Sequence, residues 1–191
     1  MKRIIFLLML ALCSPVIAGP FGFQMGMSID YISRNIKLKP GNSAGWYRSD
    51  STLVEGLVFH EYEMLITKKY GLCMIMAATK NKRTSPNGNE LKKEFHEIMG
   101  EFNKKYGPSK IYDNIKEESA LRAPDKWVMA VYNLDRNFEA IWVDRAYLSD
   151  DYLVRVDLSV VAVSNSVGAI VATYKYENYE ECLRSMKEAS F

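Results

Sequence analysis

The feature that most constrains the fold of this 191-residue chain is a regular alternation of apolar and polar side chains in several short segments. In residues 153–163, valine and leucine alternate with Arg155, Asp157 and Ser159. Such a period of two is typical of a β-strand with one buried face. After a short break, residues 169–176 predict the return strand of a hairpin. This pair of strands favours an antiparallel sheet.

Two further pairs of segments predict hairpins. Residues 57–66 and 72–79 flank one short polar turn, and residues 127–132 and 138–143 flank another. Residues 41–51 are rich in glycine and serine, which indicates a loop. Hairpins therefore account for most of the predicted strands, and the sheet is expected to be mostly antiparallel.

The clearest predicted helix covers residues 91–106, where apolar side chains recur at intervals of three and four. Ser28 is a predicted N-cap for a shorter helix, and Asn178 with Glu181 predicts the start of a last helix. Together these patterns predict an α+β fold. Its sheet is mostly antiparallel, its helices pack on one face, and each half has a helix-then-strands order.

The first eighteen residues have the layout of a secretory signal peptide. Lys2 and Arg3 precede an apolar run over residues 4–12, and short side chains lead to Ala18. We therefore expect a signal peptide at 1–18 and cleavage after Ala18. The exported protein is expected in the periplasm first, with secretion as an alternative.

The mature chain, residues 19–191, is predicted to form a single α+β domain. Hydrophobic residues make up 48% of the sequence, which is enough for a sizeable core. The helix-then-strands pattern occurs twice, so we interpret the domain as two halves, 25–80 and 89–191. No other stretch has eighteen unbroken apolar residues, and no integral membrane span is expected after cleavage.

The charge of the mature chain is balanced. Loss of Lys2 and Arg3 leaves 23 basic and 23 acidic side chains. Proteins that bind nucleic acid or anionic lipid surfaces usually present an excess of positive charge. Nucleic acid is therefore not expected as a partner.

The three cysteines of the sequence reduce to two when the signal peptide is removed. In an oxidising compartment, Cys73 and Cys182 are most simply interpreted as a disulfide, with two buried thiols as the alternative. Cys13 offers a different outcome, because residues 10–13 resemble a lipobox whose cysteine would carry a lipid anchor. Leu12 is larger than the residue such a box needs, so cleavage after Ala18 is favoured.

The sequence contains few patterns that indicate catalysis. It has neither the nucleophile elbow of hydrolases nor the glycine-rich motifs that bind nucleotides, so we expect neither an enzyme nor a cofactor. A cell-envelope hydrolase that uses His60 or His96 with carboxylates is the alternative. On a strand, His60 and the neighbouring Glu61 and Glu63 would point to opposite faces, which argues against a metal site.

Two methionine pairs suggest another alternative. Met25 with Met27, and Met74 with Met76, each place two thioethers on one face of an extended segment. Soft sulfur ligands of this kind select Cu(I), so a Cu(I) or small-ligand binder is a second alternative. The competing interpretation is that these side chains fill gaps in the core.

Aromatic side chains in predicted loops and turns are the candidate binding residues: Trp46, Tyr47, Tyr147 and Tyr152. Tyrosine and tryptophan are favoured at protein interfaces because they bury a large area at a small cost in entropy. They predict a surface that contacts another protein.

Three motifs of the mature chain resemble a loose set of small exported proteobacterial proteins. They are the segment 21–28, the run Gly71-Leu72-Cys73-x-Ile75, and Tyr174-x-Tyr176-x-Asn178 followed by Cys182. The Gly26-Met27-Ser28 opening is also similar to periplasmic domains of the β-lactamase-inhibitor and outer-membrane-assembly-lipoprotein type. This resemblance implies helices packed on an antiparallel sheet and a function in binding other proteins. The sequence thus predicts an exported protein-binding or inhibitor-type module whose partner is another envelope or secreted protein.

Overall fold

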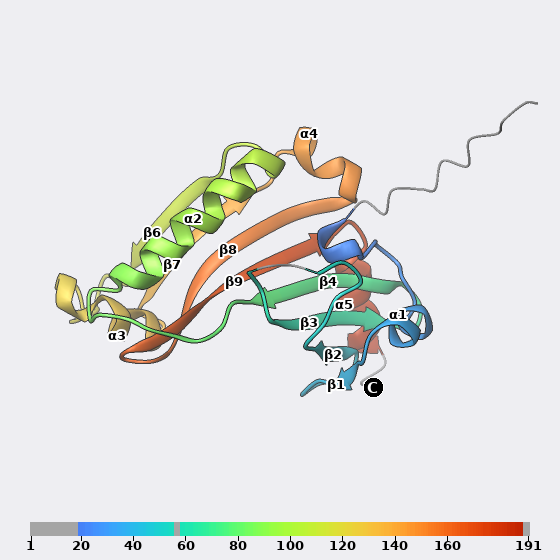
Figure 1. The fold of residues 1–191 in the computed structure, drawn as a ribbon, viewed down its shortest axis with the longest axis horizontal. Coiled ribbons are helices and arrows are strands. Elements are labelled where there is room, and N and C mark those ends of the chain that lie inside the picture. The colour runs from blue at the N-terminus through green and yellow to red at the C-terminus, as the bar shows by residue number, and fades with distance from the viewer. Residues whose placement is uncertain (1–18, 56–57, 189–191) are drawn as a thin grey trace, which may run out of the picture.

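A nine-stranded antiparallel sheet extends through the molecule (Figure 1). The computed structural model describes residues 19–55 and 58–188, so the predicted signal peptide and Cys13 lie outside the described residues. Along the sheet the strands are β1 (Lys39–Pro40), β2 (Trp46–Ser49), β3 (Glu61–Thr67), β4 (Gly71–Ala78), β9 (Val167–Tyr176), β8 (Leu153–Ser164), β7 (Arg136–Trp142) and β6 (Lys110–Ile115). The two-residue strand β5 (Lys82–Arg83) pairs with β9 beside this path. The predicted α+β class and antiparallel sheet are confirmed.

The helices connect and cover these strands. They are α1 (Ile29–Asn35), α2 (Asn89–Tyr106), α3 (Trp127–Tyr132), α4 (Arg145–Leu148) and α5 (Tyr179–Glu188), with 3₁₀ turns η1 (Pro20–Gly22), η2 (Pro124–Lys126) and η3 (Ser149–Asp151). As predicted, Ser28 caps α1: its hydroxyl oxygen accepts a hydrogen bond of 3.2 Å from the Tyr31 amide. Within the described ranges, none of the helices is long and apolar enough to cross a membrane.

The strand order places β4 and β9 side by side at the centre of the sheet. Each is the last strand of a meander, β1–β4 on one side and β6–β9 on the other, and a helix precedes each meander. The helix-then-strands order is therefore present in both halves. The division into halves at 25–80 and 89–191 stays a prediction.

The two faces of the sheet are covered differently. Helices α1, α2 and α3 contribute to the main core on one face, as predicted. Helix α5 instead lies behind β3 and β4 (Figure 1), where it packs on a second cluster that contains Leu65 and Met74. This departure from the one-face arrangement has a simple cause. Strands β3 and β4 carry apolar side chains on both faces, so one helix layer cannot bury them all.

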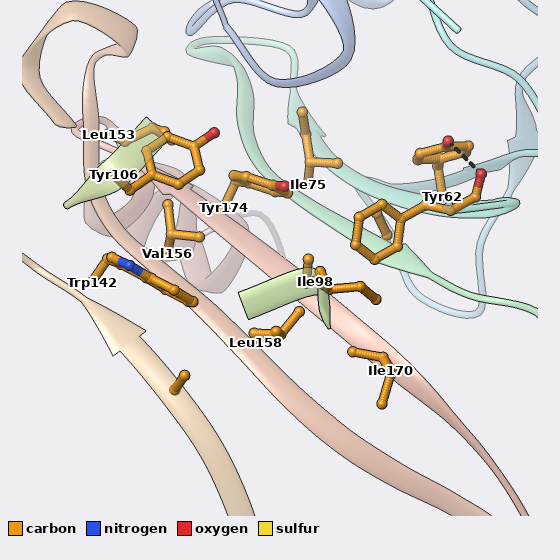
Figure 2. Packing of buried hydrophobic residues seen from close by; sticks show 14 of the residues in the cluster. Tyr62, Ile75, Ile98, Tyr106, Trp142, Leu153, Val156, Leu158, Ile170 and Tyr174 are labelled. Carbon is orange, nitrogen blue, oxygen red and sulfur yellow. Dashed lines mark hydrogen bonds between the residues drawn. The ribbon is translucent and has the colours of Figure 1, made fainter. Parts of the chain in front are cut away.

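The main core is centred on aromatic side chains beneath α2. Tyr174 of β9 is buried, and its ring lies 5.6 Å from that of Phe21 and 6.0 Å from that of Phe102. Figure 2 shows Tyr174 in the same cluster as Val156 and Trp142. Full burial of each such side chain contributes roughly 1.5–3 kcal/mol to folding.

Two buried polar groups of this core donate hydrogen bonds to nearby backbone carbonyls. The Tyr62 hydroxyl donates to the Phe59 carbonyl at 2.8 Å, the dashed line in Figure 2. The Trp142 indole N–H donates to the Gly107 carbonyl at 2.9 Å. These bonds offset the cost of removing the two groups from water.

The hairpin predicted over residues 127–143 is wrong in its first strand. Residues 127–132 form α3, in which Trp127, Val128 and Val131 are buried at helical spacing. A six-residue apolar run fits a strand or a helix equally well, and the 3₁₀ turn that starts at Pro124 leads the chain into the helix. The strand that pairs with β7 is instead β6, whose side chains are mostly exposed and lack the apolar alternation.

Two other boundaries differ from the sequence prediction. Residues 46–49, inside the predicted loop, form β2 and pair with β3. Strand β3 begins at Glu61, so His60 precedes it rather than lying on its face. Both differences concern short segments near an edge of the sheet. There, pairing with a neighbouring strand determines the secondary structure more than the local residue pattern does.

Gly88 should tolerate no side chain, whereas Gly100 in the same region should. Gly88 has a φ of +73°, and an added Cβ would lie 2.2 Å from the Trp127 ring, while nothing lies within 4 Å of one at Gly100. We expect Gly88→Ala to destabilise the fold by about 2 kcal/mol or more. The control Gly100→Ala should stabilise it by up to about 1 kcal/mol. Urea unfolding measures both, and equal effects of the two changes would contradict this account.

Glu90 should contribute stability that depends on pH. Its carboxylate accepts hydrogen bonds from the Ser85 hydroxyl, the Ser85 amide and the Thr84 hydroxyl at 2.6–2.8 Å. These bonds, led by that of the Ser85 hydroxyl, lower the pKa of Glu90 from 4.5 to about 2. Because the carboxyl pKa is lower in the folded protein than in the unfolded chain, the ionised Glu90 stabilises the fold above about pH 4.5. This contribution is lost as the pH falls towards 2.

The matched variants are Glu90→Gln and Glu97→Gln on the same helix. Urea midpoints at pH 7 and pH 3 should show wild type and Glu90→Gln converging in acid. Glu97→Gln should shift the midpoint little, since the Glu97 carboxylate forms an exposed ion pair with Lys93 at 3.9 Å. A constant difference between wild type and Glu90→Gln at both pH values would speak against the mechanism.

Candidate functional site

One face of the sheet is covered by α5 over β3 and β4 but not over β7 and β8. In β8, Val156 and Leu158 point into the main core, so Arg155 and Asp157 point to the opposite face. Neither core cluster in the described part of the chain includes a side chain from that face of β7 or β8. We call this surface the open sheet face.

The register of the strands defines the open sheet face. One row across the sheet joins Tyr112, Glu139, Ser159 and Val171, and the next row joins Ile141, Asp157 and Thr173. Arg155 of β8 also lies on this face. Tyr112, on the edge strand β6, is 38% exposed, and most of the others are half-buried. The surface therefore mixes charged, hydroxyl and aliphatic groups beside an exposed tyrosine.

An ion pair lies at the centre of the open sheet face. The Arg155 guanidinium donates to one carboxylate oxygen of Asp157 at 2.6 Å, and Asp157 is only 9% exposed. The hydrogen bond with Asp157 raises the pKa of Arg155, and the charges of Glu139 and Tyr112 act in the same direction. The guanidinium is thus a fixed cation within reach of two acidic side chains.

The four aromatic residues predicted to bind a partner do not form one site. Trp46 and Tyr47 lie on β2, where both are half-buried, Trp46 against the second cluster under α5. Tyr147 on α4 and Tyr152 after η3 are 50% and 55% exposed. Strands β3, β4 and β9 separate β2 from β8, so the two pairs lie apart.

A groove of about 860 Å³ opens beside the C-terminal end of α5, where it meets the β2–β3 end of the sheet. Its apolar lining comprises Ala44, Tyr47, Ile66, Leu183 and Met186. Its charged lining comprises Lys68, Lys69, Lys187 and Glu188. Tyr47 is the predicted binding residue that takes part in this groove.

The predicted disulfide holds the wall of the groove in place. Cys73 of β4 and Cys182 of α5 form a disulfide, with their Cα atoms 6.5 Å apart, and both residues are fully buried. The Asn178 side-chain amide adds hydrogen bonds of 3.0 and 3.1 Å to the Tyr70 and Leu72 carbonyls. Helix α5 is therefore attached to the sheet at its start and along its buried side.

The residues proposed for the alternative functions are dispersed. His60 is exposed and lines a cleft of about 390 Å³ with Asp50 and Glu55. His96 is exposed on α2, where its ring lies 6.1 Å from that of Phe138. Within residues 19–55 and 58–188, no three or more histidine, cysteine, aspartate or glutamate side chains form a group that could hold a metal ion.

The methionine pairs lie in two different places. Met74 and Met76 belong to the second cluster under α5, whereas Met25 and Met27 pack against the main core. The four thioethers therefore do not converge on one site, and their packing fits the gap-filling interpretation.

The open-face residues were only partly visible in the sequence. The alternation in 153–163 indicated Arg155, Asp157 and Ser159 as the polar side of a strand, but gave no sign that other strands extend that side. Tyr112 lies in a segment without periodicity. Its position beside Glu139 follows from the β6–β7 register alone.

Comparison of the chain with protein-family models, curated proteins and solved structures gives no match. The similarity to small exported proteobacterial proteins and to inhibitor-type periplasmic domains therefore stays a prediction.

Removal of the disulfide should destabilise the protein. The disulfide closes a loop of 109 residues, for which the chain-entropy model predicts a contribution of up to about 4–5 kcal/mol to the free energy of unfolding. We expect Cys73→Ala/Cys182→Ala to lower the melting temperature by roughly 10 °C. A reductant should lower the wild-type value similarly and leave the double variant unchanged. A wild-type protein whose melting temperature is insensitive to reductant would contradict the expected role of the bond.

Proposed function

We propose that this protein is an exported binding module that uses the open sheet face to bind another protein. The observation that carries the proposal is the Arg155–Asp157 ion pair on a sheet face that no helix of the described chain covers there. A partner that covers this face would meet a fixed guanidinium, two carboxylates and an exposed tyrosine. Arginine and tyrosine are enriched among the residues that dominate binding energy at protein interfaces.

The chemistry of the face favours a folded protein as the partner over a small molecule. The face extends over β6, β7, β8 and β9, with charged and apolar side chains side by side. Interfaces between proteins combine such apolar and polar contacts over a broad area, whereas small-molecule sites are concave.

Export is the second part of the proposal. A disulfide between Cys73 and Cys182 persists in an oxidising compartment. The predicted signal peptide would deliver the chain there, and the periplasm is the proposed destination. An envelope or secreted protein is then the partner that the module would meet.

A photo-cross-linking amino acid placed at Tyr112 tests the interaction in cells. We expect it to give a covalent adduct with one protein in the envelope fraction. The same amino acid at Tyr132 is the control, because that residue is also aromatic and 50% exposed but lies on α3. Glu139→Lys should reduce the yield from position 112 about tenfold, because it repels a partner selected for this charge pattern.

Three results would contradict the proposal: no adduct from position 112, equal adducts from positions 112 and 132, or a yield that Glu139→Lys does not change. A further variant separates binding from the hydrolase alternative. His60→Ala/His96→Ala should leave the adduct at its wild-type yield, since neither histidine lies on the open sheet face.

A further inference from the structure

The sheet ends at β6 without the protection that edge strands usually carry. This strand is the last of the path on the side opposite β1, and Figure 1 shows it at the outer margin of the sheet. Among the described residues, β6 pairs with β7 and with no other strand. The N–H and C=O groups on its outer side therefore form a row that a further strand can join.

The two edges of the sheet differ in how readily they accept a strand. Strand β1 has two residues, and Pro40 has no N–H to donate. Strand β6 has six residues, contains no proline, and is exposed from Lys110 to Asn114. An unpaired charge would discourage pairing at an edge, but Arg136 donates two hydrogen bonds of 2.6 and 2.7 Å to the Asp113 carboxylate. The sheet can thus be extended at β6.

Ile111 gives this edge an apolar side chain that the rest of the described chain leaves half uncovered. It is 49% exposed, and its register opposite Ala140 places it on the face of β6 away from Tyr112. A strand added outside β6 would cover the outer side of Ile111 and also pair the backbone groups. Both effects favour occupation of the edge.

We propose that β6 pairs with β6 of a second copy of this chain, antiparallel and about a two-fold axis at Ile111. Each copy offers the same extendable edge, so a second copy supplies a matching strand without any other protein. The pairing uses the β6 edge of both copies and closes the assembly as a dimer. The β1 edges, with Pro40, remain at the two ends of the joined sheet.

The side chains of β6 match their own copies in this register. Residues directly opposite each other on antiparallel strands point to the same face, so a two-fold axis brings one residue opposite itself. With Ile111 at the axis, two apolar side chains meet. Each Lys110 then lies opposite Tyr112, whose ring can contact the ammonium group, and each Ser109 lies opposite Asp113.

The neighbouring registers are less favourable. An axis at Tyr112 places Ile111 opposite Asp113, an apolar side chain opposite a carboxylate. An axis at Asp113 places two carboxylates opposite each other and Lys110 opposite Lys116. Like charges directly opposite each other destabilise a strand pair. The order of charged and apolar residues along β6 therefore selects the register centred on Ile111.

The interface is small, so we expect a reversible dimer. One pair of strands buries less than the roughly 1,600 Å² of a standard interface, which favours a dissociation constant in the micromolar range. The pairing uses the outer edge of β6 and does not require the open sheet face to be covered, so it is independent of the proposed function. In the cross-link from position 112, an adduct between two copies has twice the mass of the chain and is thereby distinguished from an adduct with another protein.

Sedimentation velocity of the mature protein from about 1 to about 200 µM tests for the dimer. We expect a monomer–dimer equilibrium. Ile111→Lys should raise the dissociation constant at least about tenfold, because two ammonium groups would lie opposite each other. The control Val163→Lys should leave it unchanged, since Val163 is 50% exposed but lies on β8. Unchanged melting temperatures verify that both variants fold.

Three results would refute the pairing. They are a monomer at every concentration, assembly that continues beyond the dimer, and equal effects of Ile111→Lys and Val163→Lys. A monomer at every concentration would leave the edge of β6 to a strand from a different protein.

Single cysteines test the register without adding charge. Ile111→Cys should form an intermolecular disulfide under mild oxidation, because the Cα atoms of opposite residues lie about 4.5–5.5 Å apart. In Tyr112→Cys the two copies are displaced along the strands by about 8 Å in total separation, which a disulfide does not span. Cys73 and Cys182 are fully buried and joined to each other, so they do not compete. Equal cross-linking of both variants, or none from Ile111→Cys, would overturn the proposed register.

Discussion

The pairing of β4 with β9 is the contact on which the rest of the structure depends. It joins two meanders that are far apart in sequence, in a register that runs from Met74 opposite Lys175 to Ala78 opposite Val171. On one face, Ile75 and Tyr174 close the main core beneath α2. At its end, β9 leads within three residues into α5, which brings Cys182 back over Cys73. A single sheet and a covalently fixed last helix both follow from this pairing.

The position of α5 divides the second face of the sheet into two regions. The helix covers β3 and β4, where the strands carry apolar side chains on both faces and need a second layer. It does not extend over β7 and β8, whose second face carries charged and hydroxyl groups among aliphatic ones. The groove lies at the end of the helix, and the open sheet face lies beyond it. Both candidate surfaces thus result from a helix that is shorter than the sheet is wide.

The sequence was informative where local pattern and tertiary contact agree. The N-cap at Ser28, the apolar stripe of α2, the β8–β9 hairpin and the Cys73–Cys182 bond were all predicted and are present. The prediction was wrong where contacts between residues distant in sequence determine the secondary structure. Residues 127–132 form a helix because their apolar side chains pack into the core at helical spacing. Residues 110–115 form β6 because they pair with the edge of β7. For the same reason the sequence indicated only the β8 part of the open sheet face, since the strand register alone brings Tyr112 onto the same face as Arg155.

The position of the Arg155–Asp157 ion pair supports the proposed protein-binding function. Both residues lie on one strand two positions apart, so their ion pair joins no separate elements of the fold. A partly buried charge costs free energy unless it is paired, and an apolar pair in the same positions often stabilises a protein as well or better. Thr173 and Ile141 are the cross-strand neighbours of Asp157. The ion pair on the face that α5 leaves uncovered therefore supports the proposed protein interface, because charge pairs at an interface help to select the partner.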